Sequence, residues 1–181
     1  MIWKQKGILL LLAAFGLNGC AGSPFFLGDT DAHSISRRTT SCIAIQSKAN
    51  ETELSSENCN LLALAMQNFD DEKYSESEKY FQQSIKNFKS KSGKLPNENL
   101  KSSYYGLAAS YDQEGRFKEA DATYEKIKSI FGEDLRYYNN LGYSLYLRGK
   151  TEAAIATIKK ALLIEPNNAV TLENYRIVTG G

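Results

Sequence analysis

The chain repeats its own residue pattern at an interval of 34 residues, and this feature constrains its fold more than any other. When Lys101 is aligned with Leu135, large, apolar and small residues fall at matching positions in two consecutive units. Apolar residues recur every three or four positions, so each unit is predicted to be two amphipathic helices. Gly115 and Gly149 separate the two halves, where a turn needs a positive φ. A helix pair cannot bury its apolar face alone, so the pattern predicts an all-α solenoid of stacked units.

The matching positions resemble the tetratricopeptide-repeat (TPR) family. The residues that carry the resemblance are Tyr104, Leu107, Ala108, Tyr111, Gly115, Ala120, Tyr124 and Ile127 in the first of these units, and Tyr138, Leu141, Gly142, Leu145, Gly149, Ala154, Ile158, Ala161 and Pro166 in the second. The resemblance implies that the small residues lie where two helices cross and that the large ones fill the gaps between units.

A weaker unit precedes these two and a single helix follows them. The upstream unit starts near residue 58, and Glu72 stands where the other units have their turn glycine. A basic segment, Lys89–Asn99, is predicted to be an inserted loop. Residues 169–178 are predicted to be a helix that caps the solenoid. We therefore expect a TPR superhelix of three helix-turn-helix pairs and a C-terminal capping helix over residues 58–181.

The N-terminus has the features of an export signal. Two lysines precede an apolar run, Gly7 to Leu17, that is too short to span a bilayer as a helix. The segment Leu17-Asn18-Gly19-Cys20 that follows resembles the lipobox of bacterial lipoproteins, although Asn18 departs from the usual pattern. The resemblance implies a signal peptide over residues 1–19, palmitate-type acylation of Cys20, and an outer-membrane lipoprotein facing the periplasm. An ordinary signal peptide or a short membrane anchor is the alternative.

Residues 20–57 lack helical periodicity and are predicted to be a lipidated, partly disordered tether. Two cysteines would remain after lipidation, Cys42 in the tether and Cys59 at the start of the repeats. In an oxidising periplasm they could form a disulfide. The alternative is two free thiols, with Cys59 buried on a helix.

The composition offers little chemistry. Basic and acidic residues nearly balance, at a net charge of +1, so nothing favours nucleic acid as a partner. The single histidine, His33, lies in the tether, and no cluster of histidine and cysteine suggests a metal. Residues 70–72 form an acidic group that is predicted to be a solvated turn. We expect no cofactor, no small-molecule substrate and no enzymatic activity.

The resemblance implies a binding groove lined by the first helix of each pair. Mapped onto this sequence, the groove residues are Tyr105, Asp112, Arg136, Asn139, Asn140, Tyr143 and Tyr146. Exposed aromatic residues and arginine are the usual anchors of protein interfaces. The three tyrosines are therefore predicted to anchor a protein partner. The alternative is that they only cover the groove side of the core.

Among lipoproteins with this layout, the chain resembles the TPR lipoprotein of Tad-type (Flp) pilus assembly. Residues Tyr138–Leu147 and the pair Asn174-Tyr175 carry this likeness, and their pattern is common to many TPRs. It implies a scaffold in the assembly of a pilus or secretion apparatus, with pilus or secretin components as partners. The alternatives are a general periplasmic adaptor for cell-envelope enzymes, and an enzyme whose site the sequence does not reveal.

Overall fold

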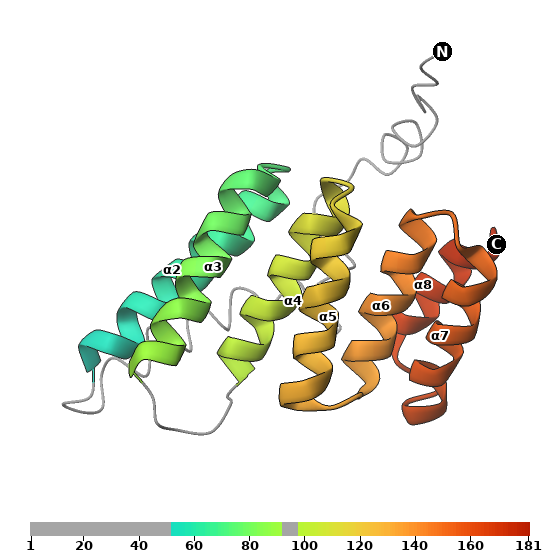
Figure 1. Cartoon of the computed structure of the whole chain (residues 1–181). Coiled ribbons are helices and arrows are strands. Elements are labelled where there is room, and N and C mark those ends of the chain that lie inside the picture. Colours follow the sequence, from blue (N-terminus) through green and yellow to red (C-terminus); the bar gives the residue numbers. More distant parts are fainter. Residues whose placement is uncertain (1–51, 92–97) are drawn as a thin grey trace, which may run out of the picture.

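The computed structural model describes residues 52–91 and 98–181, and these residues form a row of helices (Figure 1). Within these ranges the chain contains seven helices and no strand. The helices are α2 Thr52–Asp70, α3 Tyr74–Lys91, α4 Glu98–Gln113, α5 Phe117–Phe131, α6 Leu135–Leu147, α7 Thr151–Ile164 and α8 Ala169–Thr179. The all-α prediction is confirmed.

Consecutive helices pack as pairs that are stacked along one axis. Helices α2 and α3, α4 and α5, and α6 and α7 form the three pairs, and α8 lies against α7 at the end of the row (Figure 1). Contacts between α2, α4, α6 and α8 link the first helices of successive pairs. This is the predicted TPR superhelix of three pairs with a capping helix.

The turn inside each pair has the same backbone conformation. Gly115 and Gly149 have φ of 71° and 72°, in the left-handed region where a Cβ atom is unfavourable. Glu72 has φ of 60° at the equivalent place in the first pair. A non-glycine residue in this conformation is uncommon. Its presence here confirms that Glu72 occupies the turn position of a first, divergent repeat.

Small residues allow the helices to approach closely. Ala108, Ala120 and Ala154 have no exposed surface. A Cβ atom on Gly142 would lie 2.4 Å from the Ile158 side chain, so α6 and α7 could not keep their separation with a larger residue. The predicted crossings are confirmed. Gly106 makes a similar approach, with the Phe81 ring 2.1 Å from the site of its absent Cβ.

The buried apolar side chains form two clusters. The larger cluster runs from α2 to α5 and includes Phe81, Tyr105, Tyr124 and Ile127, together with Tyr137 of α6. The smaller cluster joins α7 to α8 through Ala154, Ile158 and Val178. The third repeat therefore has a core that is distinct from the core of the first two.

Two predicted boundaries differ from the structure. Helix α2 begins at Thr52, within the segment predicted to lack helix, because the repeat pattern marks packing positions and not helix ends. The loop predicted over Lys89–Asn99 is shorter, since α3 continues to Lys91 and α4 starts at Glu98. Residues 92–97 lie outside the described residues.

Candidate protein-binding groove

The predicted groove residues lie on α4 and α6, as expected, but most of them are buried. Four are almost fully enclosed, with exposed fractions of 2% for Tyr105, 3% for Asp112, 4% for Asn139 and 2% for Asn140. Arg136, Tyr143 and Tyr146 keep partial exposure. The prediction that Tyr105 is an exposed anchor is wrong, because α6 and the helix pairs on either side close over this face of α4.

Tyr105 is held by charged groups from the neighbouring repeat. The guanidinium of Arg136 lies over its ring, 4.7 Å from the centroid, and its hydroxyl donates to Asp134 at 3.3 Å. Burial and the nearby Asp134 carboxylate raise the pKa of Tyr105 well above its ordinary value. Asp134 also caps α6, where it accepts the backbone N–H of Tyr137 at 2.8 Å, and forms an ion pair with Lys101. These contacts fix the second repeat to the third at the start of α6.

Asp112 is the centre of a buried polar network at the other end of α6. Its carboxylate accepts hydrogen bonds from Ser144 at 2.7 Å and from Tyr124 at 3.3 Å, and pairs with Arg148 at 3.2 Å. Arg148 also pairs with Asp121 at 2.6 Å. Burial raises the pKa of Asp112, and the hydrogen bonds and the arginine only partly offset this. Asp112 therefore joins two repeats and is not a free anchor for a ligand.

The three asparagines of this face form a chain of side-chain amides. Asn174 of α8 donates to Asn139 at 3.0 Å, and Asn139 donates to Asn140 at 3.4 Å. Asn140 also accepts, at its backbone carbonyl, the Tyr124 hydroxyl at 3.2 Å. The amides thus link the second repeat, the third repeat and the cap. Asn174 was not among the predicted groove residues, although it stands 34 positions after Asn140.

Aromatic side chains from the first and third repeats meet at one end of the groove. Phe69 and Tyr74 form an edge-to-face pair with centroids 5.2 Å apart, and Tyr143 and Tyr146 lie 6.0 Å apart. Tyr74 and Tyr143 both pack against the larger apolar cluster. Burial, Glu72 and the nearby Tyr143 raise the pKa of Tyr74, in that order of importance. Tyr143 thus reaches across α4 toward the first repeat.

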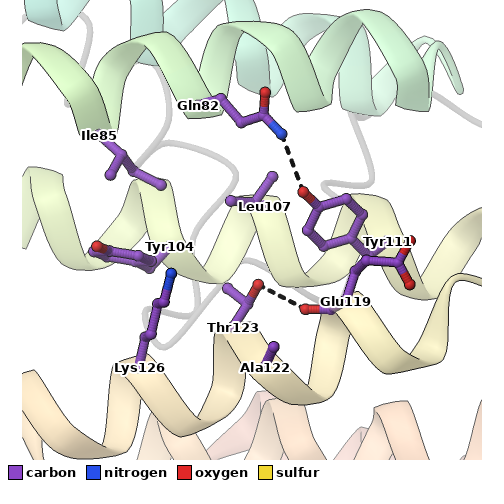
Figure 2. Close-up of a pocket in the computed structure, with 9 residues that line it drawn as sticks. All are labelled: Gln82, Ile85, Tyr104, Leu107, Tyr111, Glu119, Ala122, Thr123 and Lys126. Carbon is purple, nitrogen blue, oxygen red and sulfur yellow. Dashed lines mark hydrogen bonds between the residues drawn. The ribbon is translucent and has the colours of Figure 1, made fainter.

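A second concave surface lies on another side of α4, between α3 and α5, and was not predicted. It encloses about 330 Å³ (Figure 2). Its floor includes Tyr104, Leu107 and Tyr111 of α4. Gln82 spans it from α3 and donates to the Tyr111 hydroxyl at 3.0 Å. The floor residues occupy repeat positions that fill gaps between units, so this pocket is a packing feature of the solenoid.

The described residues offer no group of metal-ligating side chains. No helix among them has the length and apolar character needed to cross a membrane. Cys20, Cys42 and the predicted tether up to residue 51 lie outside the described residues. Cys59 lies within α2. Acylation of Cys20 and the Cys42–Cys59 disulfide stay predictions.

Comparison with known proteins agrees with this geometry. Residues 102–133 and 135–168 each match a family model of the tetratricopeptide repeat. The fold is similar to that of the C-terminal TPR-containing domain of an FK506-binding protein of Plasmodium falciparum, with a TM-score of 0.52 and 17% identity over 75% of this chain and 94% of that chain. No curated protein matches this chain. The chain contains tetratricopeptide repeats, which are a non-catalytic scaffold for protein–protein interaction.

Proposed function

We propose that this protein is a lipid-anchored TPR scaffold in the outer membrane, where it holds a protein partner during assembly of a pilus or secretion apparatus. The observation that carries the proposal is the stack of three helix pairs with Tyr143 and Tyr146 partly exposed beside a buried, rigid α4. Stacked helix pairs create extended concave binding surfaces. Tyrosine offers a large amphipathic contact area at low entropic cost.

The anchor is supported by the N-terminal sequence. The apolar run Gly7 to Leu17 followed by Cys20 fits a lipoprotein signal, and two or three acyl chains give a far more stable membrane attachment than one chain. Residues 20–51 then separate the lipid from α2 and would let the repeats reach into the periplasm. Metabolic labelling with a clickable fatty acid tests this part. Label should appear on the wild-type protein and be absent from Cys20→Ser, whereas equal labelling would contradict the anchor.

The groove is tested by a double substitution, Tyr143→Ala with Tyr146→Ala. Both side chains are partly exposed, so their loss should weaken partner binding by about 2 kcal/mol or more if they are interface hot spots. The matched control is Lys159→Gln with Lys160→Gln, two exposed residues of α7. Cross-linked pull-downs from envelope extracts compare the three proteins. The partner should be lost only from the tyrosine variant, and equal recovery from all three would rule out the groove.

The partner's identity separates the pilus proposal from the alternative. Secretin or pilin-assembly proteins in the cross-linked material support a role in a pilus or secretion apparatus. Enzymes of the cell envelope in their place support the general periplasmic adaptor. The same variants serve both cases, because a TPR groove is expected to use the same surface with either partner.

A further inference from the structure

Four aromatic residues close one end of the groove, and we call them the aromatic lid: Phe69, Tyr74, Tyr143 and Tyr146. Two belong to the first repeat and two to α6 of the third, so the lid spans the second repeat without using a residue of it. Tyr74 and Tyr143 are close enough for their phenol groups to influence each other. The lid therefore connects two repeats that are not neighbours in the sequence.

The floor beneath the lid is α4. Tyr105, Ala109 and Asp112 stand at the groove positions of this helix, with exposed fractions of 2%, 1% and 3%. Tyr105 and Ala109 belong to the same apolar cluster against which Tyr74 and Tyr143 pack. A groove that binds a partner through its floor would have to present these residues. In the closed arrangement it does not.

The contacts that hold α6 against the second repeat are mostly polar. They are the Asp112 network at one end and the Asp134 and Arg136 contacts at the other, including a 3.1 Å hydrogen bond from Arg136 to Ser102. Polar groups can exchange a protein partner for water when helices separate, so such an interface loses less on opening than an apolar one. Helix α6 carries Tyr143 and Tyr146, and it would take them away from Tyr74 if it moved.

We propose that the aromatic lid is an autoinhibitory contact: it covers the α4 floor, and a protein partner binds after α6 has moved Tyr143 away from Tyr74. The identity of the ligand as a protein rests on the proposed function. The partner that fits this site presents an apolar or aromatic side chain, which takes the place of the lid over Ala109. Binding is then weakened by the fraction of molecules that are closed.

The test measures thiol accessibility at two adjacent alanines of α4. Ala109 is a groove position under the lid, whereas Ala108 lies in the larger core with no exposed surface. Ala109→Cys and Ala108→Cys are each made in the full chain and reacted with N-ethylmaleimide. Peptide-mapped mass spectrometry reads each site apart from the native cysteines. Lid opening should expose Ala109→Cys, while Ala108→Cys should react only on larger unfolding.

We expect Ala109→Cys to react about tenfold faster than Ala108→Cys, and Tyr74→Ala to accelerate Ala109→Cys by about another tenfold with no change at Ala108→Cys. If Tyr74→Ala does not fold, Tyr146→Ala removes the neighbour of Tyr143 and leaves α3 intact. Equal rates at the two sites, or equal acceleration of both, would overturn the lid.

Partner capture distinguishes failure of the lid from failure of the proposed function. Tyr74→Ala leaves Tyr143 and Tyr146 in place, so an autoinhibitory lid predicts that it recovers more partner than the wild type. If thiol accessibility changes as expected but no partner is captured by any variant, the lid stands and the proposed function fails. If a partner is captured through Tyr143 and Tyr146 with Ala109→Cys protected throughout, the proposed function stands and the lid fails.

Discussion

The interface between the first and second repeats differs from the interface between the second and third. At the first, Phe81 packs with no exposed surface against Gly106, and two serine pairs, Ser84 with Ser103 and Ser77 with Ser110, bridge α3 and α4 at 2.8 and 3.3 Å. At the second, a buried ion pair and its hydrogen bonds join α4 to α6. The same repeat architecture is thus held together by small-residue packing in one place and by charge in the other.

Equivalent repeat positions make the contrast sharper. Leu107 and Leu141 stand 34 residues apart, yet Leu107 is buried and Leu141 is only half-buried. Tyr104 and Tyr138 differ in the same way. A large desolvation cost offsets much of the attraction in a buried ion pair, whereas apolar burial adds directly to stability. We infer that the first interface is the more stable one and that the second is the place where the solenoid opens.

The largest effect is expected from Arg148→Ala. Arg148 is 7% exposed at its side chain and its partner Asp112 is 0% exposed, so the change leaves a buried carboxylate without its cation. Breaking such a pair costs about 3–5 kcal/mol. Arg116→Ala is the control at the first interface, where the arginine pairs with Glu78 but is 40% exposed, and it should cost less than about 1 kcal/mol. Urea unfolding of the two variants compares them, and similar losses would remove the contrast.

Truncation of the two equivalent leucines comes next. Leu107→Ala should lower the free energy of unfolding by about 3 kcal/mol, as expected for a buried leucine. Leu141→Ala should cost about half as much, because its side chain is already partly in contact with water. Chemical denaturation measures both. A larger loss for Leu141→Ala would mean that the second interface depends on apolar packing after all.

Overpacking of the third repeat should cost somewhat less. Ala154 has no exposed surface at the crossing of α6 and α7, so Ala154→Leu should destabilise the protein by about 1–3 kcal/mol. Lys159→Gln on the exposed face of the same helix should stay within about 0.5 kcal/mol of the wild type. Equal tolerance of the two changes in urea melts would show that the repeat alignment is wrong.

The smallest effect concerns Asp134 and pH. Burial raises the pKa of this carboxyl, but the ion pair with Lys101 and the N–H of Tyr137 outweigh burial, so the pKa lies below its ordinary value. A lowered folded-state pKa gives stability that is present above the unfolded pKa, about 3.9, and is lost as pH falls through the folded value. Asn caps a helix as well as Asp, so Asp134→Asn isolates the charge.

At pH 7, Asp134→Asn should be less stable than the wild type by at most about 1 kcal/mol, since the side chain is 38% exposed and solvent screens the pair. Thermal melts between pH 7 and pH 2.5 should show the difference closing as the carboxyl is protonated. A difference that stays constant over this range would assign the effect to packing and not to charge.

The sequence predicted what depends on the repeat alone. The helix pairs, the close crossings at Ala108 and Ala154, and the role of Glu72 as a turn residue follow from the 34-residue pattern, because each is a contact inside one unit or between adjacent units. The burial of Tyr105 did not follow, since it depends on how strongly the superhelix curves. That curvature decides whether side chains of the first and third repeats meet across α4.

The Arg148–Asp112 pair was also beyond the sequence. The two residues are 36 positions apart, and neither belongs to the repeat pattern that relates adjacent units. Asp112 was predicted as a groove residue from its position alone, and the position is correct. Its partners were not predicted because hydrogen-bond geometry needs the distance between α4 and α6. Gly106 was missed for a similar reason, since only the Phe81 ring explains why no side chain is present.

The central claim, that the second interface opens before the first, is tested most directly by native-state hydrogen exchange of the full chain, read by mass spectrometry at increasing urea. The account predicts that peptides from α6 to α8 exchange as one unit, at a lower opening free energy than peptides from α3 and α4. Arg148→Ala should lower the first value much more than the second. Exchange of all seven described helices at a single free energy would contradict the claim.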